Sequence, residues 1–175
     1  MKKTERGMVH VYTGDGKGKT TASFGLALRM IGAGKRVFIG QFVKGMKYSE
    51  LKSLKKLGKS ITVKQYGLDC FIRKAPTEKD IEKARKGFRE ISKILILGEH
   101  DLVVLDEANI ATYYNLFSVD ELLTAMKARA PWVEVVITGR KADKKVMEFA
   151  DLVTEMLEIK HYYAAGIQAR VGVEK

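Results

Sequence analysis

The stretch Val11-Tyr-Thr-Gly-Asp-Gly-Lys-Gly-Lys-Thr20 decides the fold of this chain. A short apolar run precedes it, and a helix-like run from Ala22 to Ile31 follows it. A strand, a glycine-rich turn, Gly-Lys-Thr and a helix form the layout of a phosphate-binding P-loop. Glycine lets the backbone approach an anion closely, and the N–H groups of the turn and of the helix N-terminus can then face phosphate oxygens.

The side chains of this loop favour the same interpretation. Lys19 can reach the outer phosphates, and the Thr20 hydroxyl suits Mg²⁺. The loop is a variant of the usual Gly-x4-Gly-Lys-[Ser/Thr] pattern, because Thr13 stands at the first glycine position and Lys17 adds a second cation. An ordinary glycine-rich turn is the alternative, but the strand before it and the helix after it favour a P-loop.

Length and composition indicate a single domain over residues 1–175, with residues 1–7 as a loose basic arm. No apolar run reaches the ~18 residues of a membrane span, and the N-terminal residues lack the apolar core of a signal peptide. The single cysteine, Cys70, excludes an intrachain disulfide and fits a reducing compartment. We therefore expect no membrane partner.

The formal net charge is +11. This charge suits nucleic acid, and it equally suits a polyanionic small substrate. Many of the lysines fall on expected helix faces, where a solvated surface explains them, and no basic–aromatic module of a known nucleic-acid-binding type is present. We therefore expect a nucleotide, and no nucleic acid, as partner.

Strand-like and helix-like patterns alternate along the rest of the chain. We expect strands near 8–13, 36–43, 60–66, 101–107, 133–138 and 152–157. We expect helices near 20–33, 49–57, 77–98, from 118 onward and near 143–150, with capping boxes at Thr77 and Ser118. This alternation predicts an α/β fold of the P-loop NTPase-like (RecA-like) kind, with a mostly parallel sheet and helices on both faces.

Two acids end the buried strand Leu102-Val-Val-Leu-Asp106-Glu107. They would lie at the carboxyl edge of the sheet, where α/β proteins bind ligands. In P-loop proteins such a strand commonly lies beside the P-loop strand and serves Mg²⁺. The pattern leaves open which acid touches the metal, and in an ATPase Glu107 would instead polarise water.

Two arginines are further candidates. Arg140 follows a strand and Thr138-Gly139, so it would face the same edge and could pair with phosphate. A surface arginine after a turn explains it equally well. Arg29 lies on the expected first helix, where an exposed charge is the better explanation from spacing alone.

Several segments together resemble the ATP:corrinoid adenosyltransferases of the cobalamin-synthesis type. They are Thr13-Gly-Asp-Gly-Lys-Gly-Lys-Thr-Thr21, Phe24-Gly25 with Arg29, Val37-Phe-Ile-Gly-Gln-Phe-Val-Lys-Gly45, Asp101-Leu-Val-Val-Leu-Asp-Glu-Ala-Asn109, Val136-Ile-Thr-Gly-Arg140 and Asp151-Leu-Val-Thr-Glu-Met-Leu-Glu-Ile-Lys-His161. The similarity runs from about residue 7 to the end of the chain. The unusual Thr13 also agrees with the family's altered P-loop.

The resemblance implies a reaction and its participants. MgATP binds, and the Co(I) centre of a reduced corrinoid attacks the 5′ carbon of the ATP ribose, which releases tripolyphosphate. The family is dimeric and cytoplasmic, Mg²⁺ accompanies ATP as cofactor, and a reductase is the candidate source of Co(I). Co(I) is itself the nucleophile, so the protein's task is to stabilise the charged leaving group.

The resemblance also carries residue roles over by motif position. Lys17 and Lys19 are the candidate catalytic residues. The candidate nucleotide-binding residues are Gly14, Asp15, Gly16, Lys17, Gly18, Lys19, Thr20, Thr21, Arg29 and Arg140. The candidate metal ligands are Thr20, Glu107 and Asp106.

One segment departs from the family's best-known branch. That branch has Gly-Phe-Thr-Trp, whose aromatic residues help to displace the lower axial ligand of cobalamin, whereas this chain has Cys70-Phe71-Ile72-Arg73. Phe71 is the candidate corrinoid-pocket residue, and the missing tryptophan favours a base-free biosynthetic intermediate as substrate. Two alternatives stay open: a P-loop ATPase that drives a protein partner, and an ATPase that acts with nucleic acid.

Overall fold

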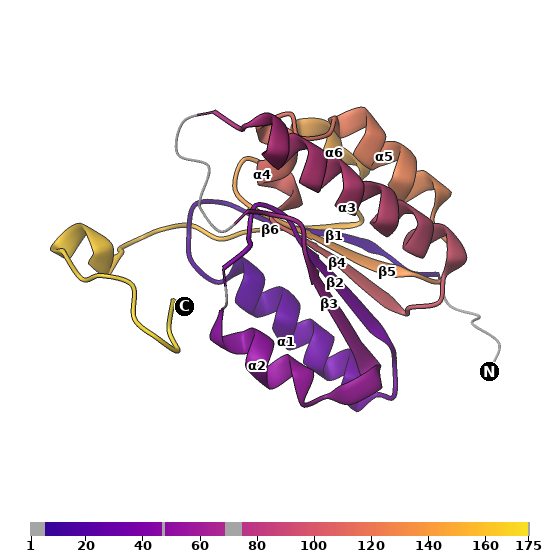
Figure 1. Ribbon diagram of the computed structural model, residues 1–175, viewed down its shortest axis with the longest axis horizontal. Helices are drawn as coiled ribbons and strands as arrows, with labels where there is room; N and C mark the ends of the chain where they lie inside the picture. Colours follow the sequence, from indigo (N-terminus) through magenta and orange to yellow (C-terminus); the bar gives the residue numbers. More distant parts are fainter. Residues whose placement is uncertain (1–5, 47, 69–74, 175) are drawn as a thin grey trace.

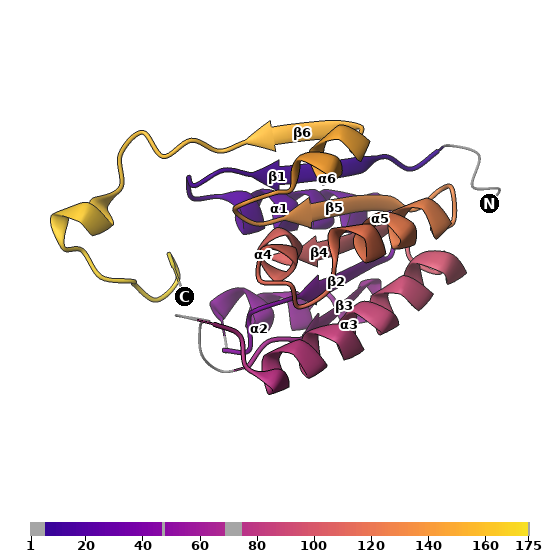
Figure 2. The same cartoon turned by 90° about the horizontal axis from the view of Figure 1, so that it is seen from above.

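Six parallel strands form one sheet in the computed structural model, which describes residues 6–46, 48–68 and 75–174 (Figure 1). The strands are β1 (Val9–Thr13), β2 (Val37–Gln41), β3 (Ile61–Gln65), β4 (Leu102–Asp106), β5 (Glu134–Thr138) and β6 (Leu152–Glu155). Their order across the sheet is β3-β2-β4-β5-β1-β6, as Figure 2 shows from above. Every neighbouring pair is parallel.

Helices cover both faces of this sheet. They are α1 (Lys19–Gly32), α2 (Ser49–Lys55), α3 (Glu78–Leu97), α4 (Ala108–Tyr113), α5 (Val119–Ala128) and α6 (Lys144–Phe149), with short 3₁₀ turns at Gly58–Ser60 and Tyr162–Ala165. The helices α1 and α2 lie on one face, and α3 to α6 lie on the other (Figure 1). The expected α/β fold of the P-loop NTPase-like class is therefore confirmed.

Each face of the sheet has its own apolar core. On the α3–α6 face, the Phe88 and Phe117 rings stack with their centroids 4.3 Å apart. On the opposite face, Phe24 and Ala27 of α1 belong to a second cluster of buried residues. All five residues of β4 are buried. The cores therefore fix the central strands, whose carboxyl ends carry the candidate site.

The helices α3 and α5 begin at the expected capping boxes, and α3 ends at the expected glycine. Thr77 and Asp80 form one capping box, and Ser118 and Glu121 form another, each with both reciprocal hydrogen bonds. Gly98 takes the left-handed conformation and ends α3. These expected boundaries are confirmed. Among the described residues, no helix has both the length and the apolar character that a membrane crossing requires.

The structure corrects two expectations and adds one helix. The strand that ends in Asp106 does not lie beside the P-loop strand, because β5 separates β4 from β1. The helix α4 follows Glu107 directly, and its six residues are too few to give a clear helical period. Gly7 is not part of a loose arm, since its N–H donates to the Pro131 carbonyl and its own carbonyl accepts from Arg129. Residues 1–5 lie outside the described residues.

Candidate nucleotide-binding site

The phosphate loop connects β1 to α1 at the carboxyl edge of the sheet. Gly14 and Gly18 have φ angles of 88° and 122°, which side chains with a Cβ rarely adopt. A Cβ on Gly14 or Gly16 would lie less than 3 Å from backbone atoms of Met156 or Leu157. The loop therefore needs glycine both for its conformation and for its close packing against the segment after β6.

Lys19 opens α1, and its ammonium is held inside the loop. It donates to the carbonyls of Gly14 and Gly16, each over 2.6 Å. Burial lowers the pKa of Lys19, and the charges of Arg140 and Lys44 act in the same direction. The Gly16 N–H donates to the Met156 carbonyl over 2.7 Å, so this donor is already engaged within the chain.

Asp106 lies at the centre of a buried polar cluster. Its Oδ1 accepts from the Thr20 hydroxyl over 2.9 Å and from the Thr138 hydroxyl over 2.7 Å. Its Oδ2 accepts from Gln41 over 3.0 Å and from Lys44 over 2.8 Å. The ends of β2, β4 and β5 and the start of α1 thus meet on one carboxylate.

The two adjacent acids have opposite pKa shifts. Burial alone would raise the pKa of Asp106, but the Lys44 ammonium and the hydrogen bonds from Lys44, Thr138 and Gln41 bring it below the usual value. Burial and the neighbouring Asp106 charge raise the pKa of Glu107. Glu107 also has a left-handed backbone, with a φ of 60°. The Lys44 ammonium and the hydrogen bonds therefore favour the ionised form of Asp106.

Lys17 points from the phosphate loop toward the C-terminal tail, residues 156–174. Its ammonium donates to Glu174 Oε1 over 2.6 Å, to the Tyr162 hydroxyl over 2.9 Å and to the Val173 carbonyl over 3.1 Å. Lys17 and Tyr162 hold the pKa of Glu174 well below its usual range. The tail therefore supplies an acidic partner for a loop cation, which no spacing in the sequence indicates.

The remaining candidates lie at different distances from the loop. Arg140 follows β5, and its Nε is 3.9 Å from Asp15 Oδ1 of the phosphate loop. Thr21 is exposed in the first turn of α1. Arg29 is in the last turn of that helix, about 15 Å along the axis from Lys19 at 1.5 Å per residue. The structure therefore brings Arg140 to the loop, whereas no described contact brings Arg29 there.

Comparison with known proteins identifies the family. The profile of the family described as ATP:corrinoid adenosyltransferase BtuR/CobO/CobP matches residues 5–174. The chain belongs to this family. Corrinoid adenosyltransferases of Pseudomonas aeruginosa and Escherichia coli K12 are 36% and 34% identical to it over 171 residues, which cover 97% of this chain and 84% and 86% of the relatives. The corrinoid adenosyltransferase CobA of Salmonella typhimurium is 36% identical over 173 residues, 97% of this chain and 86% of that relative.

The adenosyltransferase site offers oxygen atoms suited to Mg²⁺. Around the Lys44 ammonium lie Asp106 Oδ2 at 2.8 Å, Thr20 Oγ1 at 2.9 Å and Glu107 Oε1 at 3.8 Å, so three oxygens already converge on one cation. In the described part of the chain, no group of three or more His, Cys, Asp or Glu side chains forms a metal site by itself. Mg²⁺ is typically bound by one or two carboxylates together with substrate phosphates, so these residues fit it.

Sequence reasoning missed Lys44 and Gln41. Both lie where β2 ends, beside β4 in the sheet. Their segment Gln41-Phe-Val-Lys-Gly45 carried part of the family resemblance, but an isolated lysine after a strand has no spacing that marks it as functional. Pairing with Asp106, 62 residues away, becomes visible only in the folded chain.

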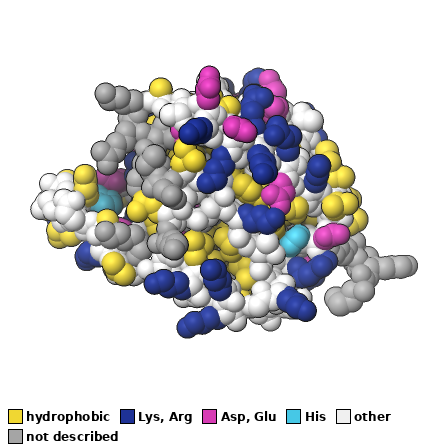
Figure 3. Space-filling view, in the orientation of Figure 1, with side chains coloured by type: hydrophobic (Ala, Val, Ile, Leu, Met, Phe, Trp, Pro, Cys, Tyr) yellow, Lys and Arg dark blue, Asp and Glu magenta, His cyan; other side chains and the backbone are white. Residues whose placement is uncertain are grey.

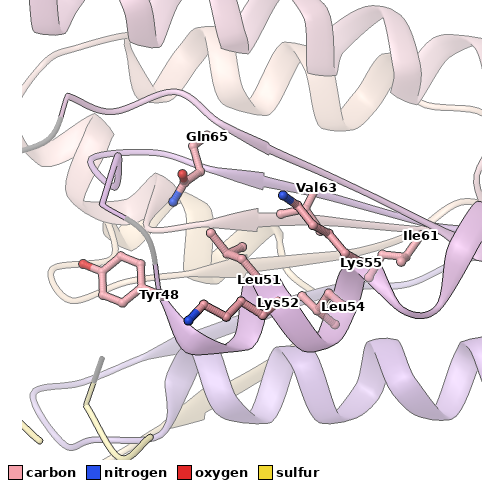
Figure 4. Close-up of a pocket in the computed structure, with 8 residues that line it drawn as sticks. All are labelled: Tyr48, Leu51, Lys52, Leu54, Lys55, Ile61, Val63 and Gln65. Atoms are coloured by element: carbon pink, nitrogen blue, oxygen red, sulfur yellow. The ribbon is translucent and has the colours of Figure 1, made fainter. Parts of the chain in front are cut away.

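A cavity of about 480 Å³ lies apart from the phosphate loop, between α2 and β3 (Figure 4). Four of its eight lining residues are leucine, isoleucine or valine, and Tyr48 and Gln65 lie toward one end. Gln65 donates to Gln41 over 3.2 Å, which links this end of the cavity to the Asp106 cluster. Phe71, the candidate corrinoid contact, lies outside the described residues, as do Cys70 and Arg73.

On the face seen in Figure 3, the lysine and arginine side chains of this adenosyltransferase do not form one continuous stripe. Lysine and arginine side chains are spread over that face, with acidic side chains among them. This arrangement is typical of a solvated surface rather than of a track for a polynucleotide backbone.

Proposed function

We propose that this chain transfers the 5′-deoxyadenosyl group of ATP to the Co(I) centre of a reduced corrinoid, in adenosylcobalamin biosynthesis or salvage. The cobalt electron pair forms a bond to C5′, the bond from C5′ to the α-phosphate oxygen breaks, and tripolyphosphate leaves. Family membership over residues 5–174 is the observation that carries the proposal. The P-loop and the Asp106 cluster agree with it.

In this proposal the chain's own residues bind and orient the triphosphate. Lys19, now on the Gly14 and Gly16 carbonyls, turns to phosphate, and Lys17 and Arg140 add positive charge at the loop. These cations stabilise the negative charge that grows on the leaving group. Thr20, Asp106 and Glu107 would hold Mg²⁺. When bound, Mg²⁺ supplies further neutralisation of the leaving phosphates.

Other parts of the proposal rest on the sequence alone, through the family resemblance or, for the single domain, through length and composition. They are a homodimer, a reductase that supplies Co(I), a cytoplasmic location, a single domain over residues 1–175 and nucleotide contacts of Thr21 and Arg29. Phe71 as a corrinoid contact and a base-free corrinoid as preferred substrate also stay predictions.

An anaerobic assay tests the reaction. Chemically reduced corrinoid, MgATP and the protein are mixed, the Co(I) absorbance is followed and the phosphate products are identified. We expect loss of Co(I) with one tripolyphosphate released per light-sensitive, adenosylated corrinoid. Lys19→Met should lower kcat/KM by about 100-fold or more, while Lys59→Met, which removes an exposed lysine, serves as the charge-matched control.

Two other outcomes would contradict the proposal. Orthophosphate that accumulates while Co(I) persists would favour a P-loop ATPase. Turnover that requires a polynucleotide and falls steeply with salt would favour an ATPase acting with nucleic acid. Cobalamin and a base-free corrinoid, assayed side by side, test the substrate preference.

A further inference from the structure

Lys44 occupies the centre of the candidate metal site. Its ammonium donates to Asp106 Oδ2 over 2.8 Å and to the Thr20 hydroxyl over 2.9 Å, and it lies 3.8 Å from Glu107 Oε1. The Lys44 side chain is 13% exposed and that of Asp106 is fully buried. A cation is therefore already held by the oxygens that the proposed function assigns to Mg²⁺.

The backbone just before Lys44 has an unusual conformation. Val43 has a φ of 57°, in the left-handed region that β-branched residues strongly disfavour. The chain bends at Phe42 and Val43, just after β2, and the Lys44 side chain reaches the end of β4. Backbone strain of this kind is typically found at functional sites. The bend at Val43 is thus a second observation, independent of the ammonium contacts, that singles out Lys44.

We propose that Lys44 is an internal counter-cation that occupies the metal position in the nucleotide-free protein, so that a divalent metal enters only together with ATP. This inference rests on the proposed function, because it takes Thr20, Asp106 and Glu107 as the metal ligands.

The charges of the site give the physical reason. Asp106 and Glu107 are adjacent and largely enclosed, and a buried carboxylate without a cation is costly. Lys44 supplies that cation when no nucleotide is present. A divalent ion entering alone would meet the ammonium among the same oxygens and be repelled by it. The phosphates of ATP bring negative charge and new acceptors, so the ammonium can leave Asp106 for phosphate without losing its ion pair.

Equilibrium dialysis with Mn²⁺ tests this inference on the full-length protein. Mn²⁺ serves as the probe because it also prefers oxygen ligands. Wild type, Lys44→Met and Lys127→Met are dialysed against Mn²⁺, first without nucleotide and then with ATP. Lys127 is exposed on α5, so its variant removes the same charge elsewhere.

We expect wild type and Lys127→Met to retain Mn²⁺ only when ATP is present. Lys44→Met should retain Mn²⁺ without ATP, with an affinity at least tenfold above that of wild type. The double variant Lys44→Met/Asp106→Asn should lose this retention, because the carboxylate that binds the ion is gone. Equal retention without ATP by wild type and Lys44→Met would overturn the inference, as would no such retention by Lys44→Met.

Thermal unfolding of wild type gives a second test that needs no variant. MnCl₂ alone should leave the melting temperature unchanged, whereas the same concentration with ATP should raise it above the value with ATP alone. A rise with MnCl₂ alone would contradict the inference. If no protein retains Mn²⁺ even with ATP, the metal site of the proposed function is wrong and the Lys44 inference falls with it. Retention with ATP, but no difference between wild type and Lys44→Met without it, rejects the Lys44 inference alone.

Discussion

The Thr20 hydroxyl donates to Asp106 Oδ1 over 2.9 Å. Thr20 follows β1 and Asp106 ends β4, and β5 lies between these two strands in the sheet. The bond joins the first turn of α1 to the end of β4. The helix α1, which follows β1, and the helix α4, which follows β4, lie on opposite faces of the sheet (Figure 1). Ligand clefts of α/β proteins open between such strands. The hydroxyl and the carboxylate are therefore positioned to share one metal ion.

Replacement of Thr20 tests this shared role. Thr20→Val keeps the shape but removes the hydroxyl, so we expect kcat/KM for MgATP to fall by about 100-fold. Thr20→Ser keeps the hydroxyl and should stay within about threefold of wild type. Adenosylation rates measured over a range of Mg²⁺ concentrations check both values. Thr20→Val with wild-type activity at low Mg²⁺ would remove Thr20 from the metal site.

Two helical glycines should respond to alanine in opposite directions. A Cβ on Gly25 of α1 would meet no atom within 4 Å, so Gly25→Ala should raise the free energy of unfolding by about 0.5–1 kcal/mol. A Cβ on Gly87 of α3 would lie 2.2 Å from Cγ of Tyr66. The Tyr66 hydroxyl donates to Glu90 over 3.0 Å, which limits how far the ring can move.

We therefore expect Gly87→Ala to lower the free energy of unfolding by about 2 kcal/mol, despite the better helix propensity of alanine. Urea unfolding of the two variants and wild type in parallel measures both changes. If Gly87→Ala instead raised the free energy of unfolding, the Tyr66 ring would have room to move away from the added Cβ on α3.

The Ser118–Glu121 capping box should contribute stability that depends on pH. The Ser118 N–H and side chain hydrogen-bond Glu121 and lower the pKa of its carboxyl from 4.5. Because the folded pKa is the lower one, the contribution is present above pH 4.5 and is lost as pH falls through the folded value. Glu121→Gln keeps an acceptor at every pH.

The stability difference between wild type and Glu121→Gln should therefore shift against wild type on acidification. We expect a change of a few tenths of a kcal/mol between about pH 6 and pH 3.5, because the group is solvent-exposed. Urea unfolding at several pH values measures it, and Glu82→Gln on the exposed side of α3 is the control. An unchanged difference over this range would mean that the hydrogen bond of the ionised carboxylate does not stabilise the helix.

The parts of the fold that sequence predicted depend on residues close together in the chain. The capping boxes at Thr77 and Ser118 each lie within four residues, and the P-loop within ten. Their geometry follows from local backbone rules, so the pattern alone locates them. The strand order does not follow from such rules, and for this reason the expectation that β4 lies beside β1 is wrong.

The site shows the same limit. Asp106 was a candidate because it ends an apolar strand, but its strongest partner, Lys44, is 62 residues away. Lys17 was assigned to phosphate from its place in the loop, yet one of its described partners, Glu174, is 157 residues away. The sequence carries no period or spacing that brings these pairs together; only packing of β2 against β4, and of the tail against the loop, does so.

The ion pair between Lys17 and Glu174 should lower the affinity of the protein for ATP. Glu174 Oε1 lies 2.6 Å from the Lys17 ammonium, so phosphate must compete with a carboxylate for this cation. Glu174→Gln removes the competing charge, and we expect it to raise the affinity for ATP by up to about fivefold at low salt. Calorimetric titration of ATP measures the change. Salt screens exposed pairs, so the gain should shrink as ionic strength rises.

Glu158→Gln is the matched control, because Glu158 is an exposed acid of the same tail. Removal of its charge alters the net charge equally, so any long-range effect on ATP binding appears in both variants. A gain confined to Glu174→Gln assigns the competition to the Lys17 pair. Equal gains in both variants would show that the tail acts only through its overall charge. A loss of affinity in Glu174→Gln would mean that the carboxylate instead holds Lys17 in place for phosphate.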